Sequence, residues 1–164
     1  MINFRQFLRG ARLVAALAAA LSIAACANLG GQNGQSNAGA QATPGSQQDF
    51  LVNVGDRVFF DTDSTALSAQ ARATLDKQAQ WLTNYSQYTF TIEGHADERG
   101  TREYNLALGA RRAQTVRDYL VSRGIAANRM HTISYGKERP VAVCDDISCW
   151  SQNRRAVTVL NASS

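Results

Sequence analysis

The chain has 164 residues, of which 45% are hydrophobic and 18% charged, a composition that is typical of one compact domain with additional segments. Its formal net charge is +4, but residues 1–25 contain three arginines and no acidic residue. The remaining residues carry 14 basic and 13 acidic side chains, a net charge of +1, so the basic balance of the whole chain does not indicate nucleic-acid binding.

The N-terminal residues have the features of an export signal. Residues 1–12 contain three arginines and no acid, and residues 13–25 are apolar apart from Ser22. This apolar run is shorter than the roughly 20 residues that a membrane span needs. Small residues precede Cys26, as they do before a cleavage site. We therefore predict a signal peptide over residues 1–25.

The sequence IAAC at residues 23–26 resembles the lipobox of bacterial lipoproteins, in which cleavage precedes a cysteine that is then lipidated. Several acyl chains hold a protein firmly at a membrane, since each buried methylene contributes roughly 0.8 kcal/mol. In such lipoproteins an aspartate after the cysteine favours the inner membrane, whereas this chain has Ala27. The resemblance implies a lipidated Cys26 in the outer membrane and a globular domain facing the periplasm. A plain secretory peptide is the alternative.

Residues 26–49 are predicted to form a flexible tether. After Cys26 they are mainly Gly, Gln, Asn, Ala and Ser. With so few large apolar side chains, the segment cannot bury enough surface to become ordered. A chain of this length has a root-mean-square reach on the order of 25 Å. We therefore expect the folded domain to comprise residues 50–164.

The first half of this domain shows two kinds of periodicity. Residues 52–60 place their apolar side chains on one parity, which predicts a half-buried strand, and residues 88–93 alternate strictly, which predicts another. Between them, apolar residues recur at spacings of four and three, as in a helix that Ser68 would cap. The side chains that carry these patterns are Val52, Val54, Val58 and Phe60, then Leu67, Ala71, Leu75, Ala79 and Leu82, then Tyr88, Phe90 and Ile92.

The second half continues the alternation of helices and strands. A helix is predicted from about residue 102 to 123, ended by Gly124 and Ile125, with a core stripe of Leu106, Ala113, Val116 and Leu120. Strands are expected near residues 130–135 and 156–160, with a loop over residues 136–146 and a short helix around residues 148–155. This order predicts an α/β two-layer sandwich of the α+β kind, with helices on one face of a small mixed sheet.

The sequence EGHADERGT at residues 93–101 joins the strand over residues 88–93 to the second helix. A loop that enters a helix N-terminus offers free backbone N–H groups and the positive end of the helix dipole. Asn105, Leu108 and Arg112 follow at spacings that place them on one helix face. With Asp97, they predict a pocket that has one anionic and one cationic wall. A ligand that carries both an ammonium and a carboxylate would satisfy both walls.

The same loop invites a catalytic or metal-binding interpretation. Glu93 and Asp97 form a candidate carboxylate pair with His95 between them, and the three could also be metal ligands. However, the chain lacks a nucleophile motif, an HExxH motif and a glycine-rich phosphate loop. His131, the other histidine, has no partner at a metal-ligand spacing. We therefore expect no enzymatic activity, no metal and no cofactor.

Cys144 and Cys149 remain once Cys26 is assigned to the lipid. Export into an oxidising compartment favours a disulfide between them. The two Cα atoms would have to approach within about 7 Å. Two free thiols are the alternative.

Residues 91–125, TIEGHADERGTREYNLALGARRAQTVRDYLVSRGI, with ISYGKERP and NRRAV further on, resemble the OmpA-like peptidoglycan-binding domain family. The resemblance covers about residues 50–160 and implies the fold of the OmpA C-terminal domain. Domains of this family hold the diaminopimelate side chain of the peptidoglycan stem peptide without a covalent bond. Two departures concern Gly109, where the wider family often has serine, and the loop CDDISC at residues 144–149.

The resemblance also implies roles for individual residues. Asp97 should pair with the diaminopimelate ammonium and Arg112 with its distal carboxylate. Either side chain could instead serve the fold alone, Asp97 by accepting loop amides and Arg112 as an ion-pair partner of Glu93 or Asp118. Further positions of the pocket match Asn105, Leu108 and Arg154. The floor of the pocket is expected at the end of the first strand, from Phe60 and Asp61.

Partners follow from the resemblance as well. The motif GHADERGT with a lipobox before it is similar to the family members that work with the Tol proteins. These members bind peptidoglycan and a TolB-like periplasmic propeller, and they support envelope integrity and cell division. A wall-binding lipoprotein without Tol partners is one alternative. A lipid-anchored enzyme that processes the cell wall is the other.

Overall fold

The computed structural model describes residues 42–161. The signal peptide expected over residues 1–25, the lipidated Cys26 and the first part of the expected tether lie outside the described residues. No helix within the described part of the chain is long and apolar enough to cross a membrane.

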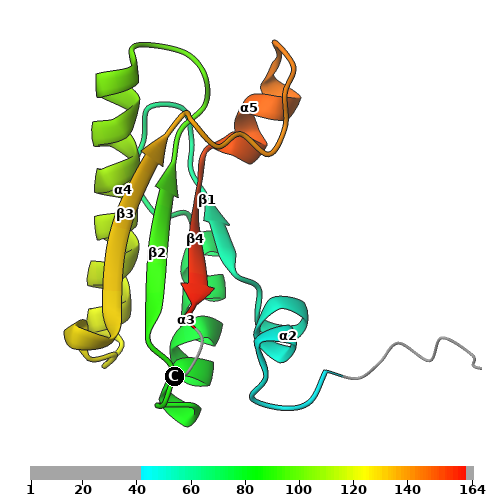
Figure 1. Ribbon diagram of the computed structural model, residues 1–164, viewed down its shortest axis with the longest axis vertical. Helices are drawn as coiled ribbons and strands as arrows, with labels where there is room; N and C mark the ends of the chain where they lie inside the picture. Colours follow the sequence, from blue (N-terminus) through cyan, green and yellow to red (C-terminus); the bar gives the residue numbers. More distant parts are fainter. Residues whose placement is uncertain (1–41, 162–164) are drawn as a thin grey trace, which may run out of the picture. The chain divides into compact units, whose positions relative to one another are not determined.

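The described residues contain one sheet of four strands: β1 (Arg57–Phe59), β2 (Phe90–His95), β3 (Met130–Gly136) and β4 (Arg155–Leu160). Their order in the sheet is β1-β4-β2-β3 (Figure 1). Strands β2 and β3 are parallel, whereas β4 runs antiparallel to both of its neighbours. The predicted mixed sheet is therefore present.

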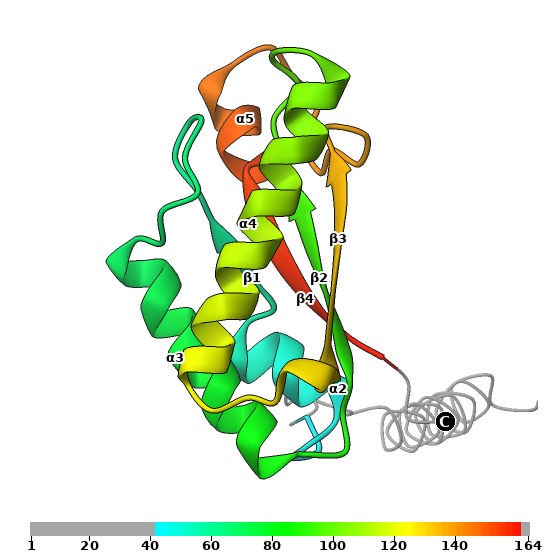
Figure 2. The ribbon, with the colours of Figure 1, turned by 90° about the vertical axis from the view of Figure 1, so that its left-hand side faces the viewer.

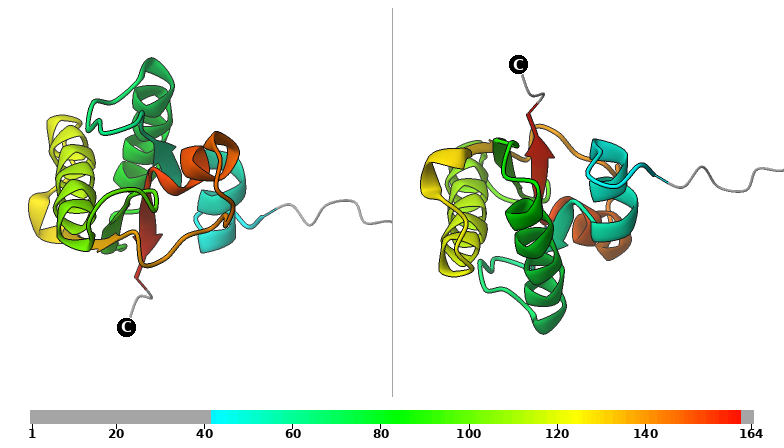
Figure 3. Two further views of the ribbon diagram at one scale, coloured as in Figure 1. Left: turned by 90° about the horizontal axis from the view of Figure 1, so that it is seen from above. Right: turned by 90° about the horizontal axis from the view of Figure 1, so that it is seen from below.

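Two long helices, α3 (Ala69–Asn84) and α4 (Arg102–Ser122), cover one face of this sheet (Figure 2). The short helices α2 (Gln47–Asp49) and α5 (Ile147–Asn153) lie on the other side of β1 and β4 from α4 (Figure 3). The π-helical turn η1 (Phe50–Val54) and the 3-10 turn η2 (Ala127–Arg129) complete the described elements. The predicted α/β two-layer sandwich is confirmed.

Helix α3 forms as the sequence predicts. The Ser68 Oγ accepts a hydrogen bond from the Ala71 N–H at 3.0 Å and so caps the first turn. Leu75 and Leu82 of the predicted stripe are fully buried. They belong to the main hydrophobic core, together with Phe90 and other residues of the sheet.

Helix α4 begins at a cap formed by Thr101, whose Oγ1 accepts the Tyr104 N–H at 3.1 Å. It ends before Gly124, which has a φ of 92°, while the Ile125 N–H donates to the Leu120 carbonyl. The predicted stripe is right at Ala113, Val116 and Leu120, which are buried. It is wrong at Leu106, which is 43% exposed.

The exposure of Leu106 has a physical reason in the close approach of α4 to the sheet. The Ser134 Oγ on β3 donates to the Leu106 carbonyl at 2.7 Å, so the helix backbone itself lies against the strand. A Cβ on Gly136 would come within 3.0 Å of the Leu106 nitrogen. No room for the leucine side chain remains on that side.

The predicted strand over residues 52–60 is wrong in its first half. Residues 47–54 form the helical turns α2 and η1, and only Arg57–Phe59 pairs as a strand. Gly55, at a φ of 89°, redirects the chain between the two. Val52 is 64% exposed, whereas Val58 and Phe60 are buried as expected.

Residues 42–49, part of the tether expected over residues 26–49, are among the described residues and contact the domain. The compact unit begins at Ala42, inside the expected tether. The Asp49 carboxylate accepts hydrogen bonds from Trp81 Nε1 at 2.8 Å and from the Gly45 N–H at 2.9 Å. The Phe50 ring lies 4.9 Å from the Trp81 ring. The composition of residues 42–50 does not indicate these contacts, because the partner Trp81 lies in α3.

Candidate functional site

A pocket of about 290 Å³ lies where the loop after β2 enters α4. Strand β2 ends and helix α4 begins at the same edge of the domain (Figure 1), and residues of the loop between them line the pocket together with the first turns of the helix. Asp97, Asn105, Leu108 and Arg112 were predicted to form one pocket, and the structure brings all four together. The lining consists of Thr62, Asp63, Asp97, Arg99, Gly100, Tyr104, Asn105, Leu108 and Arg112.

Asp97 is the anionic side of the pocket and is only 7% exposed. Its Oδ1 accepts from the Arg99 N–H at 3.2 Å and from Arg99 Nε at 3.1 Å. Its Oδ2 accepts from Arg99 Nη2 at 2.7 Å and from Arg154 Nη1 at 3.3 Å. Burial raises the pKa of Asp97, but the hydrogen bonds from the two arginines outweigh it and hold the pKa below its usual value.

Arg112 is fully buried, and its guanidinium is turned toward the backbone. It donates to three carbonyl oxygens, those of Ser64 at 2.9 Å, His95 at 2.8 Å and Asp61 at 3.0 Å. Burial, with the nearby charge of Arg154, lowers its pKa to about 10. Arg112 therefore joins α4 to two other segments of the chain, the loop after β1 and the end of β2.

The alternative ion pairs of Arg112 are not present. Arg112 forms no salt bridge with Glu93 or Asp118 in the described part of the chain. The Glu93 carboxylate lies 3.7 Å from His95 Nε2. The Asp118 carboxylate accepts from Gln114 Nε2 at 2.7 Å. The structural role that Arg112 does have is with carbonyl groups, which periodicity does not reveal.

The remaining expected residues divide between two hollows. The buried Asn105 donates from Nδ2 to the Arg99 carbonyl at 2.7 Å and thus holds the loop, while Leu108 supplies an apolar wall of the 290 Å³ pocket. Phe60, Asp61 and Arg154 instead line a second hollow of about 370 Å³. Phe60 and Asp61, expected as the floor of the pocket, are next to Arg112 as well, because the Arg112 guanidinium lies 5.1 Å from the centre of the Phe60 ring and donates to the Asp61 carbonyl. The Phe60 carbonyl accepts from Arg154.

Sequence reasoning missed the part that Arg99 plays. Its guanidinium donates two hydrogen bonds to the Asp97 carboxylate and lies 4.2 Å from the centre of the Trp150 ring. Tyr104 and Asp63 were missed too, and they are joined by a hydrogen bond from the tyrosine hydroxyl. The available signal for Arg99 was its position two residues after Asp97, a spacing that allows a turn to bring the two charges together.

Comparison with known proteins identifies the family of this chain. The model of the family described as "OmpA family" matches residues 59–156. The chain belongs to the OmpA family.

Its relatives include several proteins that carry one name. The peptidoglycan-associated lipoprotein of Rhizobium meliloti is 70% identical over 152 residues, which are 90% of this chain and 86% of that protein. The protein of the same name from Pseudomonas aeruginosa is 42% identical over 94% of this chain and 96% of its own length.

Solved structures show the same fold. The crystal structure of the peptidoglycan-associated lipoprotein from Burkholderia pseudomallei has 45% sequence identity and a TM-score of 0.63, over 65% of this chain and 90% of that one. The C-terminal domain of Helicobacter pylori MotB has a TM-score of 0.61 over 65% of this chain and 84% of that one. Since its identity is 21%, that likeness concerns the fold alone.

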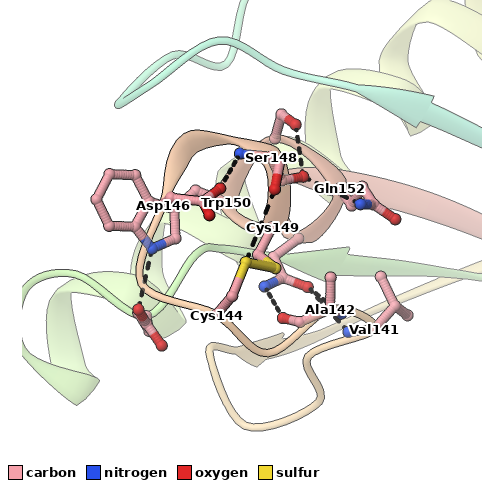
Figure 4. Close-up of a disulfide and its surroundings, with 11 residues drawn as sticks. Val141, Ala142, Cys144, Asp146, Ser148, Cys149, Trp150 and Gln152 are labelled. Atoms are coloured by element: carbon pink, nitrogen blue, oxygen red, sulfur yellow. Dashed lines mark hydrogen bonds between the residues drawn. A yellow bond between two sulfur atoms is a disulfide. The ribbon is translucent and has the colours of Figure 1, made fainter.

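The segment around α5 contacts the loop that carries Asp97. Figure 4 shows Cys144 joined to Cys149 by a disulfide, with a Cα–Cα distance of 5.7 Å. The next residue, Trp150, donates from Nε1 to Glu98 at 2.9 Å and lies against Arg99. Asn153 accepts from the Val141 N–H at 2.9 Å. The disulfide-bonded turn is thus connected to the loop that carries Asp97.

No group of three or more His, Cys, Asp or Glu side chains within residues 42–161 is arranged to hold a metal ion. His95, which was considered as a ligand, is 2% exposed, and neither of its ring nitrogens has a hydrogen-bond partner in that range. Its ring lies 5.6 Å from that of Tyr135.

His95 predicts a loss of stability in acid. Burial, followed by the charges of Arg155, Arg139 and Arg57, lowers its pKa from 6.5 to about 4, although Glu93 lies close by. Between pH 6.5 and about 4, His95 is protonated in the unfolded chain but neutral in the folded one. The free energy of unfolding therefore falls as the pH falls below 6.5. We expect this histidine to account for a loss of about 2 kcal/mol from pH 7 to 4.5, measured by urea unfolding.

A His95→Gln variant is the control for this prediction. Glutamine has no titrating group, so the difference in unfolding free energy between the variant and the wild type should change with pH by the same amount. His131→Gln, which replaces an exposed histidine, is the matched variant. Parallel pH profiles for the wild type and His95→Gln would contradict the prediction.

Proposed function

We propose that this chain is an outer-membrane lipoprotein that binds peptidoglycan non-covalently through the diaminopimelate of the stem peptide. The observation that carries the proposal is the pocket at the start of α4, in which Asp97 lies beside arginine guanidinium groups. Relatives that match most of this chain are named for their association with peptidoglycan, and this supports the same role.

The chemistry of diaminopimelate fits such a pocket. Its side chain ends in an ammonium and a carboxylate on the same carbon, so it presents both charges together. Asp97, whose pKa is held below its usual value, is ionised at neutral pH and would bind the ammonium. An arginine would bind the carboxylate, and hydrogen bonds between charged groups are roughly twice as strong as neutral ones. Asn105 and Leu108 would shape the pocket, with Arg112 and Arg154 behind it.

The N-terminal residues would provide the membrane anchor. Residues 1–25 would be removed as a signal peptide, and Cys26 would receive the lipid. The segment from residue 27 to Ala42, where the compact unit begins, would leave the folded domain free to reach the wall from the outer membrane. Such a link between membrane and wall would support envelope integrity and constriction at division.

A TolB-like periplasmic propeller would be the protein partner, as the resemblance to the Tol-associated members of the family implies. Retention of this chain on an immobilised TolB-like protein tests this part of the proposal. A chain that washes through would leave a wall-binding lipoprotein without Tol partners. Release of fragments from purified peptidoglycan would instead favour the wall-processing enzyme.

The proposed ligand predicts a preference that can be measured. Residues 27–164 should bind a synthetic stem peptide with diaminopimelate, and Asp97→Asn should weaken this binding. A lost charge-assisted hydrogen bond contributes about 1.5–3 kcal/mol, so the dissociation constant should rise about tenfold or more. Isothermal titration calorimetry gives the constant, and urea unfolding shows that the variant is folded.

Asp118→Asn is the matched control, because Asp118 is an exposed aspartate of α4 outside the pocket lining. It removes the same charge and should leave the affinity unchanged. Equal binding by the wild type and Asp97→Asn would show that the carboxylate is not a ligand contact. Failure of the wild type to bind the diaminopimelate peptide would refute the proposed function itself.

A further inference from the structure

The Asp97 carboxylate is saturated with donors from its own chain. A carboxylate offers about four acceptor positions on its two oxygens. Among the described residues, Arg99 supplies three N–H donors and Arg154 supplies a fourth. An ammonium that enters the pocket therefore finds Asp97 occupied, and one of these donors has to leave before the ammonium can bind.

Arg99 is the donor that can leave. The Arg154 side chain is only 8% exposed, and its Nε also holds the Phe60 carbonyl at 3.0 Å. The Arg99 side chain is 40% exposed. Apart from Asp97, its guanidinium contacts Thr62 Oγ1 at 3.4 Å and the face of the Trp150 ring. Its release from Asp97 disturbs no buried group other than the carboxylate.

Once released, Arg99 is the arginine best placed to meet a ligand carboxylate. It lines the pocket and is exposed, whereas Arg112 lines the pocket but is fully buried, with three donors engaged by backbone carbonyls. The adjacent Glu98 already accepts from Trp150 Nε1 at 2.9 Å. An anionic group on the ligand would replace the ion pair that a released Arg99 loses with Asp97.

We propose that Arg99 is a specificity-determining residue: it occupies Asp97 as an internal cation, and a ligand displaces it efficiently only by supplying both an ammonium for Asp97 and a carboxylate for Arg99. This inference rests on the proposed function and assigns the selectivity of that same pocket. A lysine side chain brings the ammonium but no carboxylate, so it breaks the Asp97–Arg99 pair without replacing it. Diaminopimelate replaces both partners of the pair.

The test is the affinity of Arg99→Gln for two stem peptides, one with diaminopimelate and one with lysine. With the internal cation gone, lysine no longer has to break an ion pair. Its affinity should rise about tenfold above the wild-type value, the change that corresponds to 1.4 kcal/mol. The preference for diaminopimelate should fall. Arg99→Lys keeps the charge but lacks the paired N–H groups, so its affinity for the lysine peptide should be intermediate.

Arg102→Gln is the matched control. Arg102 is an exposed arginine at the start of α4, and it pairs with Glu138 outside the pocket lining. Its removal changes the net charge equally and should leave both affinities as in the wild type. Calorimetry on residues 27–164 gives the constants, and urea unfolding checks that each variant is folded.

The outcomes separate this inference from the function on which it rests. If Arg99→Gln binds the lysine peptide no more tightly than the wild type does, the role of Arg99 is overturned. The proposed function would still stand in that case, provided that the wild type binds the diaminopimelate peptide. An equal rise in Arg102→Gln would also overturn the role of Arg99, because the effect would then be one of net charge. A wild-type chain that binds neither peptide refutes both.

Discussion

Replacing Arg112 with methionine is expected to lower the free energy of unfolding by about 3–5 kcal/mol. The methionine side chain fills much of the same space but has no N–H groups. The carbonyls of Ser64, His95 and Asp61 would each lose a donor. A buried polar group left without a partner costs about 1–3 kcal/mol, and partial access of water to the loop carbonyls reduces the sum. Urea unfolding at pH 7, followed by circular dichroism, measures the loss.

Arg111→Met is the matched control for this prediction. Arg111 precedes Arg112 in α4 but is exposed, so its replacement should change the unfolding free energy by less than about 0.5 kcal/mol. A loss below about 1 kcal/mol in Arg112→Met would show that the three carbonyls find other partners. The comparison also bears on binding, because a destabilised Arg112 variant that binds poorly does not identify a ligand contact.

Arg112 illustrates how far sequence reasoning reached at the site. Spacings of three and four along α4 correctly placed it on one face with Asn105 and Leu108, and the preceding strand and loop brought Asp97 to the same end. Spacing does not give depth, however. The carbonyls that hold Arg112 come from distant segments, so the buried position of its guanidinium became visible only in three dimensions.

The fold was predictable where one face of an element meets the core along its whole length. Helix α3 and strand β2 meet this condition, since Leu75, Leu82, Phe90 and Ile92 are all fully buried. The segment over residues 52–60 does not. Val52 and Val54 have the same alternation as Val58, but the chain turns at Gly55, and the preceding residues coil beside Trp81. Alternation cannot distinguish these two cases.

Gly94→Ala is expected to destabilise the domain by about 3 kcal/mol, at the upper end of the usual cost of overpacking. A Cβ at Gly94 would overlap the carbonyl oxygen of Gly109 and lie 2.6 Å from its carbonyl carbon. Both atoms belong to the backbone of α4, so neither can rotate away. The strand and the helix would have to separate, and urea unfolding should report the cost.

Gly109→Ala provides a graded comparison, because the nearest atom to its Cβ is the Ser134 Oγ, which can rotate, while the Gly94 oxygen lies 2.8 Å away. Its loss of stability should therefore be the smaller of the two, and losses in the reverse order would contradict the packing argument.

Separation of α4 from β2 would also move Asn105 and Leu108 relative to Asp97, since the helix carries the first two and the loop after the strand carries the third. Gly94→Ala should consequently weaken binding of the diaminopimelate peptide even in the fraction that remains folded. The glycine contact between β2 and α4 thus fixes the geometry of the pocket as well as the stability of the fold.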